Sequence, residues 1–354
     1  MYAYVVTGFG GPETLEYREV PDPLPGPGEV RIRVAAAGLN NTDIWTREGA
    51  YGAPGDPSRA TGWRREALSF PRIQGADVAG YVDRVGPGVP SVRVGERVLV
   101  DPMLYGGGER ELVVTDYLGS ERDGGFAEYV TVPSGNVHVI ASSLTDAELA
   151  TFPTAYTTAM RMLNRAGAGA GREETVLVTG ASGGVGSALI QLARARGAHV
   201  VAVVGAGKET RATELGADAT VPRPRSPEEA ARLPDAVAAA WDRPVDVVAD
   251  VVAGPVFAPL LTALRPLGRY VVAGGIAGPL VETDLRTIYL KQLTLVGSSF
   301  GAHEDFAELV RLIETGALRP LLAATYPLRA LPEAQAAFTA KSFFGNLAVL
   351  PDRN

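Results

Sequence analysis

The sequence predicts an α/β protein in which a β-rich N-terminal part precedes a doubly wound parallel sheet. Up to about residue 140, short alternating apolar runs are separated by Gly- and Pro-rich turns, as in PGPGEVRIRV and VRVGERVLV. From about residue 145, apolar runs typical of strands alternate with helical segments, which favours parallel strands with helices on both faces. Residues 175–204 supply the third observation, because they combine a strand, a glycine-rich turn, a helix and a second strand.

The N-terminal part is expected to form short strands joined by turns. Strands are predicted at Leu15–Val20, Val30–Ala35 and Gly80–Val85. The stretch Gly49–Phe70 is aperiodic and rich in Gly, Pro and Arg. Connections longer than about 12–15 residues are uncommon and are often functional. We therefore interpret this stretch either as a lid or binding loop, or as a solvated insertion.

The segment 175–204 carries the clearest functional signal. The apolar run Val176–Thr179 leads into the turn, where Gly183 and Gly186 would let the backbone approach a pyrophosphate and let the helix pack against the strand. N–H groups at the start of the helix would then face the phosphates. Ala181 stands where the G-x-G-x-x-G pattern has its first glycine, so the pyrophosphate is expected to sit slightly differently. The segment predicts dinucleotide binding; a tight turn in another kind of α/β protein is the alternative.

Further elements follow the same alternation. The helix after the glycine-rich turn has an apolar stripe at Val185, Ala188, Leu189, Leu192 and Ala193. Additional strands are predicted at Val245–Val251, Gly268–Ala273 and Leu293–Val296. Additional helices are predicted near Thr210–Leu215, after Ser226 and over Val256–Leu264. The C-terminal tail is predicted to hold a helix at Glu304–Thr315 and a strand at Asn346–Leu350.

Composition narrows the class of protein. With 354 residues, of which 46% are apolar and 21% charged, the chain is long enough for two globular domains. Its net charge of −7 argues against nucleic acid as a main partner. No apolar run approaches the ~20 residues that span a bilayer and no signal peptide is visible, so we expect a cytoplasmic protein without a membrane partner. The absence of cysteine excludes disulfides, thiolate metal ligands and a cysteine nucleophile.

Several motifs occur in an order and spacing that resemble one known family. They are AAAGLNNTD at 35–43, GADVAGYVDRVGPGV at 75–89, VGERV at 94–98, DGGFAEYVTVP at 123–133, FPTAYTTAMRML at 152–163, the GASGGVG turn and LRPLGRYVVAGG at 264–275. On these motifs the chain resembles the medium-chain dehydrogenase/reductases over nearly its whole length, and among them the zinc-independent quinone oxidoreductases. The resemblance implies a GroES-like β-barrel catalytic domain over 1–150, a Rossmann domain over 151–297 and a return to the catalytic domain over 298–354. It also implies an active site in the cleft between the domains.

The resemblance also indicates whether this chain can bind a catalytic zinc ion. Zinc alcohol dehydrogenases of this superfamily hold a catalytic zinc ion through a Cys, a His-Glu pair and a later Cys or Asp. Asn40, Ala76–Asp77 and Thr154 stand at those positions here. A zinc site takes about four N, S or carboxylate ligands, so one carboxylate cannot hold the ion, and Met103–Gly119 offers no structural-zinc ligand set either. We therefore expect a metal-free enzyme that transfers a hydride to a quinone, enone or enoyl-type substrate, with hydrogen-bond donors stabilising the charge on the neighbouring carbonyl.

Four residues are candidates for catalysis. The amide of Asn40, which zinc-free relatives also keep, would donate to an oxyanion; alternatively it closes a turn. The resemblance implies that Thr42 is the polar side chain nearest the substrate oxygen, whereas Asp43 more often caps the following helix. Tyr51 stands where enoyl reductases of the superfamily carry a proton donor; alternatively it packs on the substrate. Asp77 is either an acid–base group or a structural partner in the space left by the metal, and we favour the structural role.

The cofactor is predicted to be NADPH. An NAD-specific fold places an acidic residue ~20 positions past the glycine-rich turn, but this chain reads VVGAGKETR there. Small residues beginning with Gly205 leave room for the 2′-phosphate, and Lys208 or Arg211 would pair with it. The alternative is that Lys208 is only a surface lysine. We expect the cofactor site to comprise Asn40, Thr158, Ala181, Ser182, Gly183, Gly184, Val185, Gly186, Gly205, Lys208, Arg211, Val251, Gly274, Ser298, Phe300 and Asn346.

The expected function is therefore that of an NADPH-dependent, metal-free oxidoreductase acting on a small-molecule substrate. Two alternatives remain, since a fold does not determine function. One is a natural-product tailoring reductase or cyclase on the same fold, and the other is a non-catalytic NADPH-binding protein. Zinc-free relatives are commonly dimers that pair through the edges of their Rossmann sheets, so the resemblance implies a homodimer.

Overall fold

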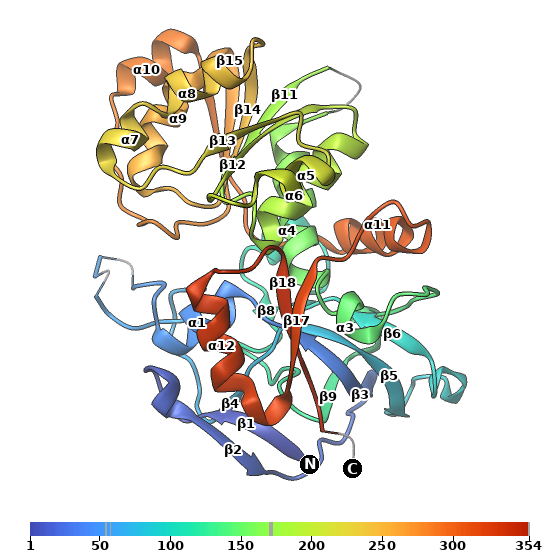
Figure 1. Cartoon of the computed structure of the whole chain (residues 1–354). Helices are drawn as coiled ribbons and strands as arrows, with labels where there is room; N and C mark the ends of the chain where they lie inside the picture. The colour runs from blue at the N-terminus through green and yellow to red at the C-terminus, as the bar shows by residue number, and fades with distance from the viewer. Residues whose placement is uncertain (54, 57, 170–172, 353–354) are drawn as a thin grey trace. The chain divides into compact units, whose positions relative to one another are not determined.

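The computed structural model describes residues 1–53, 55–56, 58–169 and 173–352, and it contains two compact units (Figure 1). Unit 1 comprises Met1–Thr154 and Ala302–Asn354, and unit 2 comprises Ala155–Gly301. Both units mix helices and strands, as expected for an α/β protein. None of the helices in the described part of the chain is long and apolar enough to span a lipid bilayer.

Unit 1 is built around a sheet of seven strands. Its order is β10-β6-β5-β3-β18-β17, with β9 also paired to β3. The strands are β3 (Glu29–Gly38), β5 (Asp77–Val85), β6 (Arg97–Val100), β9 (Tyr129–Pro133), β10 (Val137–Val139), β17 (Leu322–Pro327) and β18 (Asn346–Leu350). The C-terminal β18 pairs antiparallel with β3, so the tail of the chain completes the sheet begun by the N-terminal part.

Smaller elements surround this sheet. The strands β1 (Tyr2–Val6), β2 (Leu15–Glu19) and β4 (Arg72–Ile73) form a three-stranded sheet, and β7 (Met103–Leu104) pairs with β8 (Asp116–Tyr117). The helices of unit 1 are α1 (Asn41–Glu48), α2 (Glu109–Leu112), α3 (Asp146–Leu149), α11 (His303–Glu314) and α12 (Leu331–Ala340). Short 3₁₀ turns lie at Pro12–Thr14, Ser91–Arg93, Ser134–Asn136 and Leu328–Ala330.

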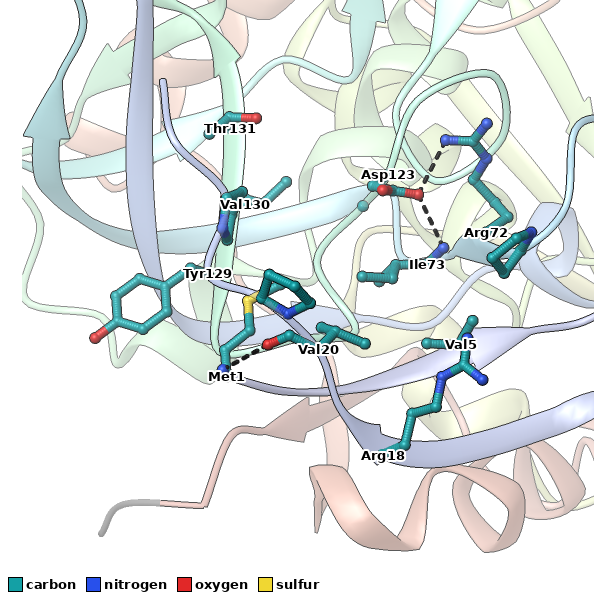
Figure 2. A pocket seen from close by; sticks show the side chains of 14 residues that line it. Met1, Val5, Arg18, Val20, Arg72, Ile73, Asp123, Tyr129, Val130 and Thr131 are labelled. Carbon is teal, nitrogen blue, oxygen red and sulfur yellow. Dashed lines mark hydrogen bonds and ion pairs between the residues drawn. The ribbon is translucent and has the colours of Figure 1, made fainter. Parts of the chain in front are cut away.

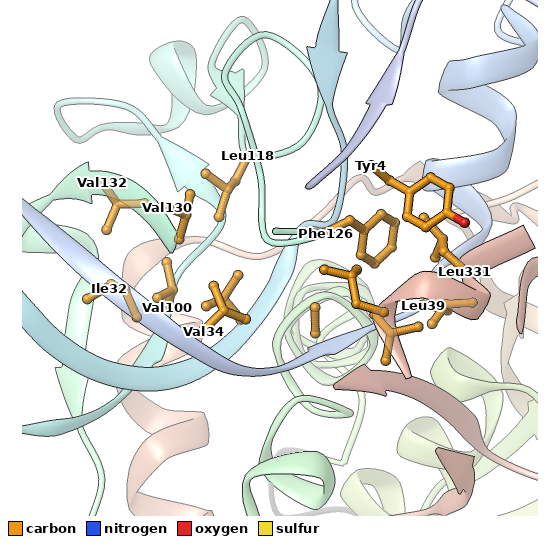
Figure 3. Close-up of a cluster of buried hydrophobic side chains, with 14 of the residues drawn as sticks. Tyr4, Ile32, Val34, Leu39, Val100, Leu118, Phe126, Val130, Val132 and Leu331 are labelled. Carbon is orange, nitrogen blue, oxygen red and sulfur yellow. The ribbon is translucent and has the colours of Figure 1, made fainter. Parts of the chain in front are cut away.

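The core of unit 1 consists of side chains from strands that are distant in sequence (Figure 3). Alternate residues of β3 and β9 point inward, among them Ile32, Val34 and Val130, because successive side chains of a strand face opposite sides of the sheet. Phe126 and the α12 residue Leu331 belong to the same buried cluster. This core packs against β3 and β5, and the candidate site begins at the ends of these strands.

A close backbone approach at Gly38 joins four segments of unit 1. Gly38, the last residue of β3, is in register with Asp77 on β5 and with Ala348 on β18. A Cβ atom at position 38 would overlap the carbonyl oxygen of Ala150, which directly follows α3. Only glycine allows this contact without displacing the backbone. The approach brings the start of β5 and the segment after α3 to the same place.

Unit 2 holds the expected doubly wound parallel sheet. Its strand order is β13-β12-β11-β14-β15-β16, and every pair is parallel. In sequence order this reads 3-2-1-4-5-6, the arrangement of dinucleotide-binding sheets. The strands are β11 (Thr175–Val178), β12 (His199–Val204), β13 (Ala219–Pro222), β14 (Val245–Asp250), β15 (Leu264–Val272) and β16 (Thr294–Gly297).

Helices cover both faces of this sheet. One face carries α7 (Pro227–Ala231), α8 (Leu233–Ala240), α9 (Phe257–Ala263) and α10 (Leu285–Lys291), whose apolar side chains join those of the strands in one cluster. On the other side of the sheet lie α4 (Pro153–Ala166), α5 (Gly184–Ala195) and α6 (Glu209–Glu214) (Figure 1). Helix α5 buries its predicted stripe from Ala188 to Ala193, and it also buries Gln191, which donates to the hydroxyl of Tyr156 on α4.

The glycine-rich turn differs from the expectation in one detail. Its left-handed residue is Gly180, with φ of 56°, whereas Ala181 is buried and is not among the residues with positive φ. Alanine is therefore accommodated at the first position of the pattern without backbone strain. A Cβ atom on Gly186 would overlap the Gly180 carbonyl oxygen, so this glycine is what lets α5 pack against the end of β11.

Several elements were not predicted. The helices α8, α10 and α12 and the strands β13 and β17 are missing from the sequence-based assignment, and the predicted helix at Val256–Leu264 ends at Ala263 because Leu264 already begins β15. Strand β17 alternates exposed and half-buried residues, and α10 buries no residue.

Candidate active site

Seven polar side chains of unit 1 gather where β3 and β5 meet the starts of α1 and α4. All four residues predicted to be catalytic are among them. We call this group the polar cluster, and it comprises Asn40, Thr42, Asp43, Tyr51, Asp77, Tyr117 and Thr154.

The start of α1 fixes the position of Asn40. The backbone of Asn40 is extended, and its N–H donates to Asp43 Oδ2 at 2.7 Å. The buried Asp43 carboxylate also accepts the backbone N–H groups of Gly75 and Ala76. Burial raises the pKa of Asp43 to about 8, more than these N–H groups lower it. Asp43 thus joins the α1 start to the segment before β5, which agrees with the structural role expected for it.

Asp77 is fully buried at the first position of β5. Its Oδ1 atom accepts the backbone N–H of Thr154 at 2.9 Å and also the Thr154 hydroxyl. The Tyr117 hydroxyl lies 2.7 Å from Thr154 Oγ1. Burial raises the pKa of Asp77 to about 6, although its hydrogen-bond donors oppose the shift. Asp77 is therefore a carboxyl group that changes its protonation state near neutral pH.

Two polar atoms of this cluster lack a partner. Among the described residues, neither Asp77 Oδ2 nor Asn40 Nδ2 makes a hydrogen bond, although the Asn40 carboxamide lies close enough to lower the pKa of Asp77. Asp77 is 0% and Asn40 9% exposed, so water does not freely solvate either group. Leaving a buried polar atom unpaired costs about 1–3 kcal/mol, and such atoms are uncommon in folded proteins. Asn40 Nδ2 is a donor, and Asp77 Oδ2 becomes a donor when the carboxyl group is protonated, so in that state both atoms can donate to one ligand oxygen.

Tyr51 lies next to Thr42. Its hydroxyl donates to Thr42 Oγ1 at 3.0 Å, and its ring packs edge-on against Trp45. Burial raises the pKa of Tyr51 to about 12, and the negative charges of Asp43 and Glu121 add to the shift. The phenol therefore keeps its proton at neutral pH.

The stretch 49–70 is fastened to the segment that carries Tyr117. The Trp63 indole N–H donates to Glu121 Oε2 at 3.0 Å, and the same oxygen accepts the backbone N–H of Tyr117 at 3.0 Å. An ion pair of 2.8 Å joins Arg64 to Asp116. Residues 54 and 57 of this stretch lie outside the described residues. The sequence gives no sign of Tyr117, because no spacing of residues links this tyrosine to Thr154.

The cavity in Figure 2 is separate from the polar cluster. It has a volume of about 250 Å³ and lies beside β1, β2, β4 and β9, with Arg18, Arg72, Asp123 and Tyr129 in its wall. Arg72 and the backbone N–H of Ile73 both donate to Asp123. No residue of the polar cluster lines this cavity.

The polar cluster does not fit a zinc ion. The four positions that correspond to zinc ligands hold one carboxylate, and one oxygen of that carboxylate is already engaged by Thr154. Ala76 has no ligand atom, and the described residues contain no group of three or more His, Cys, Asp or Glu side chains that could hold a metal ion. Zinc sites require about four N, S or carboxylate ligands.

In unit 2, most predicted cofactor residues follow the carboxyl ends of the parallel strands. This is the edge at which doubly wound sheets bind dinucleotides. Ala181 to Gly186 follow β11, Gly205, Lys208 and Arg211 follow β12, Val251 follows β14, Gly274 follows β15, and Ser298 and Phe300 follow β16. Thr158 lies on α4, whereas Asn40 and Asn346 belong to unit 1.

Asp250 organises this edge and was not predicted. At the end of β14 it accepts the hydroxyls of Thr179 and Tyr270 and the backbone N–H groups of Val252 and Ala253. These bonds hold the loop after β14, in which Ala253 adopts a φ of 53°. The sequence feature that could have identified Asp250 is its position as an acidic residue at the end of an apolar strand.

Two cations lie at neighbouring strand ends. Lys208 follows β12 and Arg223 follows β13, and the N–H of Arg223 donates to the carbonyl of Val204 at 2.6 Å. Burial and the positive charge of Arg223 lower the pKa of Lys208. Two positive charges at neighbouring strand ends favour an anionic ligand there. Sequence reasoning named Lys208 and Arg211, but not Arg223.

Comparison with known proteins matches two family models to this chain. The family model for the alcohol dehydrogenase GroES-like domain matches residues 26–142, and the model for zinc-binding dehydrogenases matches residues 184–315. An acryloyl-coenzyme A reductase of Sulfurisphaera tokodaii is 31% identical, over 99% of this chain and 100% of the relative. A quinone oxidoreductase of Mus musculus is 30% identical, over 94% of this chain and 92% of the relative.

Solved structures agree with these matches. A candidate alcohol dehydrogenase from Sinorhizobium meliloti 1021 is 55% identical with a TM-score of 0.94, over 99% of this chain and 97% of that chain. A crotonyl-CoA carboxylase/reductase in complex with NADP is 25% identical with a TM-score of 0.83, over 99% of this chain and 94% of that chain. From the GroES-like domain, the doubly wound sheet and relatives that match over nearly their full length, it follows that the chain belongs to the medium-chain dehydrogenase/reductase family.

Proposed function

We propose that the protein is an NADPH-dependent oxidoreductase that reduces a quinone, enone or enoyl-type substrate without a metal ion. The observation that carries this proposal is the polar cluster. At the positions of the zinc ligands it offers buried hydrogen-bonding atoms instead of a ligand set. The similar acryloyl-coenzyme A reductase and quinone oxidoreductase support a small conjugated substrate.

The polar cluster can stabilise the charge that such a reduction creates. Bound NADPH supplies a hydride. A conjugated carbonyl then gathers negative charge on its oxygen, to which the unpartnered Asn40 Nδ2 would donate. The Tyr51 phenol, which stays protonated, would give a proton to an enolate. Because hydrogen-bond donors polarise a carbonyl less strongly than a metal ion does, an activated, conjugated substrate is favoured over a simple ketone.

A cofactor assay tests the proposal directly. Purified protein mixed with NADPH and 1,4-benzoquinone, methyl vinyl ketone or crotonyl-CoA is expected to oxidise the cofactor, and dialysis against a strong chelator should leave that rate unchanged. The loss of stoichiometric zinc together with activity would contradict the metal-free mechanism. If NADPH binds but none of the three compounds causes its oxidation, the result would favour a non-catalytic binding protein.

The change Tyr51→Phe tests the proton donor. Turnover with an enone or enoyl-type substrate is expected to fall by about 10²–10⁴-fold, because a positioned donor contributes roughly that much. The Kd for NADPH should stay unchanged. The partly exposed Tyr17 of β2 offers a matched control, Tyr17→Phe, which should behave as the unmodified protein. Near-normal turnover of Tyr51→Phe would show that Tyr51 is not the proton donor and only packs against its neighbours.

Substitutions of Lys208 and Arg223 test the preference for NADPH over NADH. Lys208→Ala and Arg223→Ala are each expected to raise the NADPH Kd about tenfold, because each removes a charge-assisted hydrogen bond to the 2′-phosphate. The NADH Kd should hardly change. Arg225→Ala removes an exposed neighbouring charge and serves as the control. Equal affinity of the unmodified protein for NADPH and NADH would refute the assignment.

We further propose a homodimer that forms through the edge of the parallel sheet. Strand β16 ends the sheet and pairs only with β15 in the described residues. Its Leu295 and the α10 residues Leu285, Tyr289 and Leu290 are exposed apolar side chains. An exposed apolar edge strand invites pairing with another strand, and two copies can satisfy each other through a twofold axis.

A charge on this edge should separate the subunits. Leu295→Lys is expected to convert a dimer into a monomer in analytical ultracentrifugation, because burying an unpaired ammonium is costly. Leu24→Lys, at an exposed leucine of unit 1, should leave the mass unchanged. A monomeric unmodified protein at micromolar concentration would disprove the dimer.

A further inference from the structure

The two oxygens of the Asp77 carboxyl group have different surroundings. Oδ1 accepts two donors from one residue, the backbone N–H and the hydroxyl of Thr154. Oδ2 has no hydrogen-bond partner among the described residues. The backbone N–H cannot turn away, because Thr154 lies in the first turn of α4. Oδ1 is therefore held as an acceptor.

Tyr117 holds the Thr154 hydroxyl in this orientation. A threonine hydroxyl has one hydrogen and can accept through its lone pairs. The Tyr117 hydroxyl is 2.7 Å from Thr154 Oγ1, and burial raises the pKa of Tyr117 well above its ordinary value, so the phenol keeps its hydrogen. When Tyr117 donates to Thr154, the threonine hydrogen remains for Asp77 Oδ1. A proton on Asp77 must then reside on Oδ2.

The protonated Oδ2 would stand beside another free donor. Asn40 Nδ2 is also buried without a hydrogen-bond partner in the described residues, and the Asn40 carboxamide lies near the Asp77 carboxyl group. Together they present one acid O–H and one amide N–H. A single carbonyl oxygen can accept both.

We propose that Asp77 is the catalytic acid that protonates the carbonyl oxygen of the substrate, and that Thr154 and Tyr117 are positioning residues that keep this proton on Oδ2. When the substrate accepts the hydride, the π-electron pair of its carbonyl moves onto the oxygen. The O–H bond of Asp77 breaks, its proton forms the new O–H bond of the product, and Asp77 becomes a carboxylate that takes a proton from water before the next turnover. Charge and atoms balance when each turnover is counted as one hydride from NADPH and one proton from the solvent, which Asp77 passes to the substrate oxygen.

This inference rests on the proposed function and narrows its substrate class. Reduction of a quinone or another carbonyl ends with a proton on oxygen, which Asp77 supplies. Reduction of an enoyl thioester ends with a proton on carbon, for which an acid at the carbonyl oxygen is not needed. The polar cluster therefore fits a quinone-type carbonyl better than an enoyl thioester.

The change Asp77→Asn distinguishes reduction of a quinone carbonyl from reduction of an enoyl thioester. It keeps the Oδ1 acceptor and removes the acidic proton. With 1,4-benzoquinone the turnover number is expected to fall by about 10²–10⁴-fold, while the NADPH Kd stays the same. Any turnover with crotonyl-CoA should persist. Asp101, another buried carboxyl group of unit 1 outside the polar cluster, provides the control Asp101→Asn, which should keep the quinone rate. An undiminished quinone rate in Asp77→Asn would overturn the inference and leave the proposed function standing, whereas an unmodified protein that reduces none of the compounds would overturn both.

A double-mutant cycle tests the positioning residues. Tyr117→Phe is expected to lower the quinone turnover number about tenfold, the value of roughly one hydrogen bond, but to cause no further loss in the Asp77→Asn background. Thr154→Ser should keep most of the rate that Thr154→Val loses, because serine retains the hydroxyl. A loss from Tyr117→Phe that is equal in both backgrounds would show general damage and would overturn the positioning role. The comparison of Thr154→Ser with Thr154→Val does not use Asp77→Asn, so it keeps the inference testable if Asp77→Asn fails to fold.

Discussion

The polar cluster depends on the close backbone approach at Gly38. Because no side chain stands at that position, the end of β3 can lie in register with Asp77 of β5 and against the Ala150 carbonyl that follows α3. The segment after Ala150 then reaches α4, whose Thr154 binds Asp77. A larger residue at position 38 would separate these elements. One glycine thus determines where three parts of the chain, distant in sequence, place their polar groups.

Burial gives the cluster its chemistry. Asp43 and Asp77 both lie out of contact with solvent, and desolvation raises the pKa of each. Their hydrogen-bond partners decide what each group does. Asp43 is surrounded by backbone N–H groups and fixes the start of α1. Asp77 keeps one oxygen without a partner in the described residues, so it remains available to a ligand. Two similar carboxyl groups therefore take a structural and a chemical role.

In unit 2 the order and direction of the strands position the predicted cofactor site. The carboxyl ends of parallel strands lie at one edge of the sheet. The segments that follow β11, β12, β14, β15 and β16 therefore lie at that edge, although they are far apart in the sequence. Asp250 then orders the loop after β14, and Gly186 lets α5 begin close to β11. The cations at the ends of β12 and β13 come together because those strands are neighbours. Arg223 is near Lys208 for this reason alone.

The sequence by itself determined the parallel sheet and the glycine-rich turn, because local patterns of residues carry that information. It singled out Asn40, Thr42, Tyr51 and Asp77 through the resemblance of its motifs to a known family. It did not reveal short exposed elements such as α10, which buries no residue. Only the tertiary structure decided that Tyr117 reaches Thr154 and that Arg223 lies beside Lys208. Contacts of this kind join residues far apart in sequence, and they depend on strand register and close packing, which no local pattern of residues records.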